Sequence, residues 1–359
     1  MALVFLDGLE GYASNTDMIM GGGPAKWAAI SVSGGGSVAA LNTSYRTAQV
    51  VTANSRCLYF YASSYTNATL QVPAASEYIV GFGFYSAAAG YHGLVGFHGL
   101  GSHTNGVVIG LNGSMQMVIA NPHASGWGGI GTVQQTSTGT ISTNVWHYIE
   151  VRVKCHATAG EVEIFLNGVS FWSVTNANTN VGTANTYQWL TFGGCYANTC
   201  NAYYDDFYVV DKSGTTNNTF LGPVSVYSLM PTANGSSTQM TPTGVASNWD
   251  AVNDGTNDTT TYVSTGTTGN KDYYTFEQLP GTVTSVSGVL LKARNTQAAS
   301  GTRKVILNLK NGASVISSTL RALVFGSWVQ EYFVADTQPD GSAWTPAAVN
   351  SSEGGTEAG

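Results

Sequence analysis

Two glutamates, Glu161 and Glu163, are the residues of this chain whose type and spacing come nearest to acid/base chemistry. Positions two apart on a strand share a face, so both carboxylates would project together, as glycoside hydrolysis by paired carboxylates requires. A glucanase-type strand needs a third acid at the next alternate position, and Phe165 stands there instead. The pair therefore indicates a solvent-facing strand beside the turn Asn167-Gly168. We expect no catalytic residue, and we expect that the chain is not an enzyme.

Asp205 and Asp206 form a second pair of acids, but they are adjacent, so a strand would point them to opposite faces. They therefore cannot act as one acid/base pair, and we expect Asp206 to accept a hydrogen bond from loop backbone. Calcium is an alternative at this place, since the two carboxylates and loop carbonyl groups could supply oxygen ligands. Asn-rich turns explain the same residues without an ion, so we expect no metal ligands and no cofactor.

Four of the six histidines, His92, His98, His103 and His123, fall within one stretch of the chain. A zinc-type site needs three or four converging ligands, usually with Cys or carboxylates among them. Residues 87–145 contain no Cys, Asp or Glu. We therefore expect these histidines to hydrogen-bond backbone groups in loops.

His123 and Trp127 are the candidate ligand-binding residues, because they share the glycine-rich segment Asn121–Gly129. An exposed indole ring can stack on a pyranose ring through its apolar face. The alternative is that Trp127 plugs the end of a β-sandwich.

The elements that must position these residues are β-strands. Only 9% of the 359 residues are charged, where soluble proteins average about 25%. The chain is rich in Gly, Ser, Thr, Asn, Val and Tyr, which favours strands over exposed helices. An apolar content of 43% excludes a disordered chain, and no apolar run is long enough for a membrane-spanning helix.

The distribution of charge limits the classes of partner that this chain could bind. The net charge is −7 and the 13 basic residues are scattered, so no stripe could neutralise several phosphates. We therefore expect neither nucleic acid binding nor membrane insertion. A neutral surface of Ser, Thr and Asn suits sugar hydroxyls, or packing against other protein subunits.

Two Asn-Gly dipeptides and one alternating segment predict antiparallel pairing. Asn112-Gly113 and Asn167-Gly168 each lie between β-rich runs and fit a type I′ hairpin, in which both central residues have positive φ. In Trp146–Lys154, apolar Ile149, Val151 and Val153 alternate with charged residues. That period of two predicts a strand with one face on a core and the other in water.

Composition divides the chain into two all-β domains, each a β-sandwich. We place the first domain at residues 1–212, a linker at 213–222, the second domain at 223–350 and a flexible acidic tail at 351–359. The strands expected in the second domain are Val224–Leu229, Tyr273–Phe276, Val283–Leu291, Lys304–Leu309, Ser314–Thr319 and Ser327–Ala335.

The four cysteines are too few for a disulfide scaffold of this length. Cys195 and Cys200 could close a loop, but the N-terminal residues lack the basic and apolar regions of a secretory signal. We therefore expect reduced thiols, and a chain kept inside a cell or exported by a route that the sequence does not encode.

Four segments occur in an order that resembles the second half of a concanavalin A-like (laminin G-like) jelly roll: Trp146–Val151, Val162–Gly168, Leu190–Gly194 and Tyr204–Val209. The opening, Phe5–Tyr12 followed by Lys26-Trp27, looks like the start of such domains in tailed-bacteriophage structural proteins. Four further segments of this chain resemble other parts of these phage proteins. Phe220–Pro231 resembles their domain junction, and their second domain is resembled by Asn248-Trp249, Asp258–Tyr262 and Ala343–Asn350.

This resemblance implies a concanavalin A-like jelly roll followed by a smaller jelly-roll-like sandwich. It implies a structural component of a phage virion, such as a fibre, spike or decoration protein, assembled in the host cytoplasm. Such a protein would dock on other virion proteins and contribute to attachment at a host cell-surface glycan. It would form a homo-oligomer, a trimer in the case of a fibre. The alternatives are a glycan-binding, lectin-like module and a glycoside hydrolase on the same fold.

Overall fold

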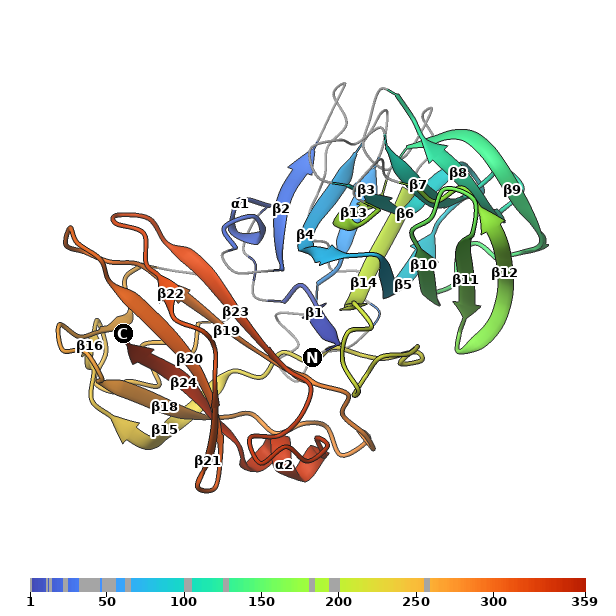
Figure 1. The fold of residues 1–359 in the computed structure, drawn as a ribbon. Coiled ribbons are helices and arrows are strands. Elements are labelled where there is room, and N and C mark those ends of the chain that lie inside the picture. The colour runs from blue at the N-terminus through green and yellow to red at the C-terminus, as the bar shows by residue number, and fades with distance from the viewer. Residues whose placement is uncertain are drawn as a thin grey trace.

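The computed structural model describes residues 2–10, 12, 15–21, 25–31, 46, 56–61, 66–99, 105–124, 129–180, 185–193, 201–254 and 259–359. Nearly all the described structure is β, and it forms two sandwich domains joined by an extended segment (Figure 1). This confirms the predicted fold class. The described helices are short, α1 (Asn15–Met18) and α2 (Pro346–Ser351). Neither has the length and apolar character needed to cross a bilayer.

The first domain is a pair of antiparallel sheets packed face to face (Figure 1). In spatial order, one sheet contains β1 (Leu3–Asp7), β14 (Asn201–Val210), β5 (Glu77–Ser86), β10 (His147–Lys154), β11 (Gly160–Leu166) and β12 (Val169–Ala177), with β3 (Leu58–Tyr61) beside β14. The other contains β2 (Lys26–Ser31), β4 (Asn67–Ala75), β13 (Tyr187–Gly193), β6 (His92–His98), β7 (Gly106–Leu111), β8 (Gln116–Pro122) and β9 (Ile130–Thr140).

Aromatic side chains fill the space between these two sheets. Trp27 is fully buried and meets the rings of Phe207 and Phe5 edge to face, at centroid distances of 5.3 and 5.7 Å. Its indole Nε1 donates to the Asp7 carboxylate at 2.7 Å, so its only polar atom is satisfied. Ile149, Val151 and Val153 point into the same core, as their alternation predicts.

The two Asn-Gly hairpins differ in geometry. Asn167 and Gly168 both have positive φ, 53° and 79°, which confirms the predicted turn between β11 and β12. The prediction for Asn112-Gly113 was wrong, because the left-handed residue there is Met115, with a φ of 59°. The N–H of Met115 donates to the Asn112 carbonyl, so a four-residue turn that ends on the left-handed Met115 connects β7 to β8.

The second domain is smaller and also antiparallel. Its main sheet contains β15 (Pro231–Thr238), β18 (Lys271–Phe276), β24 (Glu353–Ala358), β20 (Lys304–Asn311) and β21 (Ser314–Ser317), with β22 (Arg321–Ala322) beside β20. Two further pairs are β16 (Thr241–Thr243) with β17 (Tyr262–Ser264), and β19 (Val289–Asn295) with β23 (Val329–Ala335). Buried Leu307, Leu309 and Trp344 lie in its core.

Three expectations for this domain were wrong. Of Val283–Leu291, expected as one strand, only the last three residues lie in a strand, where they begin β19. Instead of a flexible tail, the chain after residue 352 forms β24, which is hydrogen-bonded to β18 on one side and to β20 on the other. A Cβ atom at Gly355 would overlap the carbonyl oxygen of Asp272, so glycine permits this close approach of strands. Val224–Leu229, expected as a strand, pairs with no strand that the structure describes; it belongs to the extended segment between the domains.

That segment, residues 211–230, passes over the outer face of the first sheet. Phe220 packs against Phe165 with ring centroids 4.3 Å apart. The N–H of Gly222 donates to the Glu150 carboxylate at 2.8 Å, and the Tyr208 hydroxyl donates to the same oxygen. Glu150, expected on a wet face, is therefore fully buried, and burial raises its pKa.

The two domains also contact each other directly. Asp336 of the second domain accepts hydrogen bonds from the backbone N–H groups of Ala2 and Leu3, at 2.8 and 3.2 Å. A buried apolar cluster joins Leu3 to Val334 beside these bonds. The junction is therefore a packed interface as well as a covalent connection.

Candidate functional site

A polar groove lies at one end of the first sandwich, where the ends of β7, β8 and β9 meet the segments that follow β10 and β12. Its volume is about 730 Å³. Its polar side chains are Asn105, Asn121, His123, Thr132, Asn178 and Asn180, and we call it the asparagine groove.

Hydrogen bonds tie the walls of the asparagine groove to one another. The amide nitrogen of Gln134 on β9 donates to Oδ1 of Asn121 at 2.7 Å and to the carbonyl oxygen of Asn178 at 3.1 Å. Oδ1 of Asn178 accepts from the N–H of Asn180 at 3.2 Å, and the N–H of His123 donates to the carbonyl of Gly129 at 2.9 Å. The groove is therefore held in shape by Gln134, which joins separate segments, and by local bonds within its walls.

The chemistry of the groove is that of neutral hydrogen-bonding groups. The described residues that line it carry no carboxylate, lysine or arginine, and His123 is the titratable side chain among them. An asparagine amide carries two donor hydrogens and an acceptor oxygen, and Thr132 adds a hydroxyl. Such a lining can match paired hydroxyl groups on a ligand without the desolvation cost of a buried charge.

Of the two candidate ligand-binding residues, the structure places His123 in this groove, half-buried in its wall. Trp127 lies outside the described residues. Sequence reasoning missed Asn105, Asn178 and Asn180. The sequence signal for Asn178 and Asn180 was the segment Asn176–Asn180, in which asparagine occupies every other position across the end of β12.

Glu161 and Glu163 lie on β11, at alternate positions of the strand that the sequence predicts. The Arg152 guanidinium binds both, with Nη2 3.0 Å from Oε2 of Glu161 and Nη1 3.1 Å from Oε2 of Glu163. A hydrogen bond from Lys154 holds the pKa of Glu161 below its usual range. The two glutamates therefore belong to an ion-pair network on a strand face.

The geometry predicted for Asp205 and Asp206 was wrong in one respect. The strand bulges between Asp205 and Tyr208, and Asp206 has a φ of 52°, so both carboxylates reach Arg46. Asp205 accepts from the Arg46 N–H at 2.7 Å and Asp206 from its guanidinium at 2.5 Å. Asp206 also accepts from the N–H of Val226 at 2.7 Å, the loop-backbone bond that we expected.

The described histidines of the 92–123 stretch do not converge. His92 lies 3.0 Å from the Ser86 hydroxyl and His98 lies 2.9 Å from the Thr191 hydroxyl, both buried. Burial lowers the pKa of His92 to about 4. Within the described ranges, no three His, Cys, Asp or Glu side chains come together as metal ligands would. His103 lies outside the described residues.

The cysteine prediction is open in part. Cys195 and Cys200 lie outside the described residues. Cys57 and Cys155 are buried and not bridged.

Comparison with known proteins gives likenesses of architecture. No protein-family profile matches this chain, and no curated protein does. Among solved structures, an endo-β-1,4-glucuronan lyase from the fungus Trichoderma reesei is similar over 57% of this chain and 94% of its own, with a TM-score of 0.40 and 14% identity. A galectin-like-fold protein from Bacillus subtilis is similar over 59% and 96%, with a TM-score of 0.38 and 11% identity.

An alginate lyase is also similar, over 58% of this chain and 95% of its own, with a TM-score of 0.37 and 13% identity. These lyases contradict our expectation that the chain is not an enzyme, because that expectation rested on a missing acidic triplet and β-sandwich enzymes are among its likenesses. At these TM-scores they assign no reaction to this chain. None of the three structures is described as a phage virion protein, so the phage resemblance stays a prediction.

Proposed function

We propose that this protein binds a neutral region of a glycan in the asparagine groove. The observation that carries the proposal is the composition of the groove, whose described lining is rich in amide side chains and free of carboxylate, lysine and arginine. Vicinal hydroxyl groups of a sugar present donors and acceptors in pairs, and an asparagine amide presents the complementary pair. A charged lining would instead favour an ionic ligand.

The fixed walls of the groove favour this function. Gln134 holds Asn121 and the backbone of Asn178 in place before any ligand arrives, so less conformational freedom is lost on binding. His123 lies on the same wall. An open, polar groove of this kind gives modest affinity for each site, which several copies in one assembly would raise by avidity.

The direct test is a glycan array followed by calorimetric titration of the glycan that binds best. Asn105 is exposed at the rim, so Asn105→Ala removes an amide without disturbing the fold. We expect at least about tenfold weaker binding, which is the loss of one well-placed hydrogen bond at about 1.4 kcal/mol. Thr319→Ala, at an exposed position of the second domain, is the control and should bind as the wild type does.

Two results would contradict this function. One is an array on which the wild-type protein binds nothing. The other is a binding glycan whose affinity is the same for the wild type and for Asn105→Ala and Asn178→Ala.

A second candidate is a structural role in a phage virion, as the sequence resemblance implies. It is supported by the packed contact between the domains, in which Asp336 holds the backbone of Ala2 and Leu3, because a particle component benefits from a fixed two-domain unit. Immunogold labelling of purified virions tests it. Label on particles would support this role, and label that never appears on them would exclude it.

A further inference from the structure

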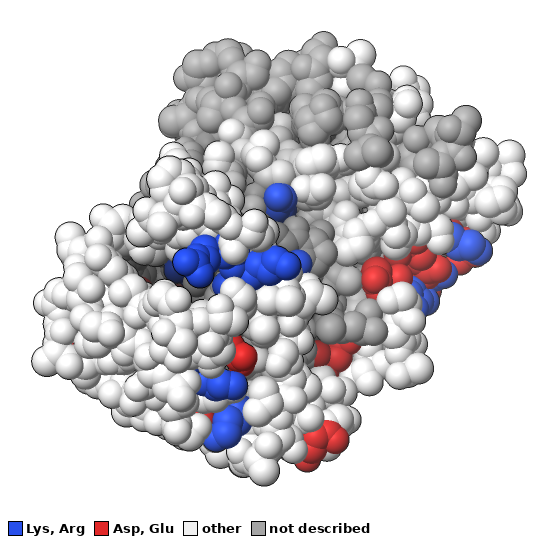
Figure 2. Space-filling model, turned by 60° about the vertical axis from the view of Figure 1, so that its left-hand side comes forward, with Lys and Arg blue, Asp and Glu red and all other residues white. Residues whose placement is uncertain are grey.

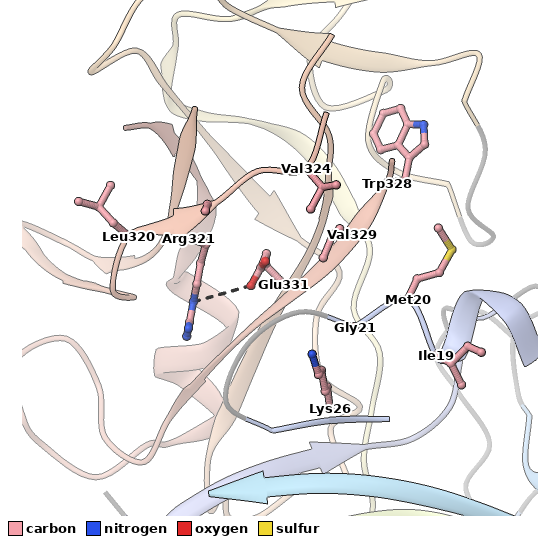
Figure 3. A pocket seen from close by; sticks show the side chains of 11 residues that line it. Ile19, Met20, Gly21, Lys26, Leu320, Arg321, Val324, Trp328, Val329 and Glu331 are labelled. Carbon is pink, nitrogen blue, oxygen red and sulfur yellow. Dashed lines mark ion pairs between the residues drawn. The ribbon is translucent and has the colours of Figure 1, made fainter. Parts of the chain in front are cut away.

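A second hollow, of ≈ 580 Å³, lies at the junction of the two domains. Its wall from the first domain is the segment around Met20 and Lys26, and its wall from the second domain runs along β22 and β23 (Figure 3). We call it the interdomain pocket and define it by Met20, Lys26, Arg321, Val324, Trp328 and Glu331.

The interdomain pocket has more positive than negative charge. Lys26 has no carboxylate within ion-pair distance among the residues that the structure describes. Nε of Arg321 lies 3.7 Å from the Glu331 carboxylate, beyond hydrogen-bond reach, and it makes no hydrogen bond within the described part of the chain. Two cations therefore face one carboxylate, which leaves one unit of positive charge in the pocket.

The surrounding surface strengthens this field. The guanidinium carbon of Arg294 lies over the ring of Trp328, 5.4 Å from the ring centroid. Figure 2 shows Lys and Arg side chains gathered in the hollow where the two domains meet. In a chain with a net charge of −7, this local excess of basic side chains is a departure from the average surface.

The rest of the pocket wall is apolar. Trp328, Met20 and Val324 line it, and Val324 is 46% exposed. Figure 3 shows Lys26 rising between the Arg321–Glu331 pair on one side and Met20 on the other, with Trp328 and Val324 above. Such a wall suits a ligand with two features. The cations can bind an anionic group, and the indole can pack against a ring that has one apolar face.

We propose that the interdomain pocket binds a sugar that carries one carboxylate, such as a hexuronate unit. Lys26 and Arg321 hold the carboxylate, and Trp328 packs against the apolar face of the sugar ring. The single negative charge of a carboxylate balances the single excess positive charge of the lining. A doubly charged phosphate would bring more negative charge than the lining can balance. This site is separate from the asparagine groove and does not depend on it.

The proposal has a structural consequence. Lys26 belongs to the first domain and Arg321 to the second, so one carboxylate would bridge both. A ligand that contacts both domains binds the assembled molecule more tightly than the separated one, and therefore raises the free energy of unfolding.

The test compares glucuronate oligosaccharides with their methyl esters by calorimetric titration of the full chain. We expect the acid to bind and the ester, which lacks the charge, to bind at least about tenfold more weakly. We expect Lys26→Met to weaken the acid at least about tenfold and to leave the ester unchanged. Lys154→Met is the control. It removes a lysine of the first domain that lies on β10, in the other sheet from Lys26, and the variant should bind the acid as the wild type does.

Several results would overturn the proposal. One is equal affinity for the acid and the ester. Another is an affinity for the acid that Lys26→Met leaves unchanged. A third is competition in which inorganic phosphate displaces the bound oligosaccharide at the same concentration as free glucuronate does. If Lys26→Met does not fold, as judged by circular dichroism, Arg321→Gln supplies the same comparison from the other wall. Asn105→Ala separates the two sites, since it should affect the asparagine groove and leave glucuronate binding intact.

Discussion

The hydroxyl oxygens of Tyr12 and Tyr332 lie 3.1 Å apart, one from each domain, and both side chains are buried. Tyr12 also donates to the Asp7 carboxylate at 2.6 Å, and the ammonium group of Lys292 lies 3.5 Å above its ring. A chain of polar contacts therefore runs from the core of the first domain into the second. Such a chain fixes the angle between domains, because buried polar groups need partners at defined positions.

We expect Tyr332→Phe to lower the free energy of unfolding by about 1 kcal/mol, since it removes one buried hydrogen-bonding partner of Tyr12. A double-mutant cycle with Tyr12→Phe, measured by urea unfolding, should show that the two losses do not add. Additive losses would mean that the two hydroxyls do not interact.

Asp336 predicts a larger effect at the same interface. Asp336→Ala leaves the N–H groups of Ala2 and Leu3 buried without their acceptor, which costs about 2 to 3 kcal/mol. The loss should appear as a lower midpoint in thermal unfolding. Asp340→Ala, which changes an exposed turn of the same domain, is the matched control. Equal midpoints for the two variants would contradict this account of the interface.

Glu10 predicts a pH dependence of stability. Burial, with smaller effects from Asp205 and Asp7, raises its pKa to about 10 from an ordinary value of 4.5. The folded carboxyl group therefore keeps its proton at pH 5–9 while the unfolded one ionises, so the free energy of unfolding falls as pH rises across this window.

Glu10→Gln removes that ionisation from the unfolded chain. We expect the free energy of unfolding of the variant to rise relative to that of the wild type as pH rises, by about 4 kcal/mol between pH 5 and pH 8, measured by urea unfolding at each pH. A difference between variant and wild type that does not change with pH would contradict the buried, protonated state.

Glu150 and Glu163 predict opposite outcomes on neighbouring strands. Glu150 is buried and accepts from the Tyr208 hydroxyl and the N–H of Gly222, so Glu150→Ala should cost about 2 to 3 kcal/mol of unfolding free energy. The Glu163 side chain is 39% exposed in its ion pair, so Glu163→Ala should cost less than about 1 kcal/mol. Urea unfolding of both variants checks the difference, and similar losses would contradict the burial of Glu150.

The sequence predicts the parts of the fold that local rules govern. The alternation of Ile149, Val151 and Val153 identifies β10 and its core face, and Asn167-Gly168 identifies a hairpin, because both signals depend only on neighbouring residues. The position of β24 could not be predicted, since Glu353–Ala358 has few β-favouring residues and gains its place from strands distant in the chain.

The candidate site was predictable only in part. The segment Asn121–Gly129 indicated a ligand loop, and His123 lies in the asparagine groove. The alternating asparagines of 176–180 marked Asn178 and Asn180, but tertiary packing brings them to the same groove as His123, and no local pattern encodes that placement. The burial of Glu150 was missed for a similar reason, because Gly222, its partner, lies 72 positions away in sequence.

Hydrogen–deuterium exchange with and without the glycan selected on the array tests the central claim most directly. The proposed function predicts slower exchange at Asn121–Ala124 and Asn178–Asn180 when the glycan is bound, with the outer face of β11 unchanged. Slower exchange confined to any other part of the first domain would contradict the asparagine groove as the binding site.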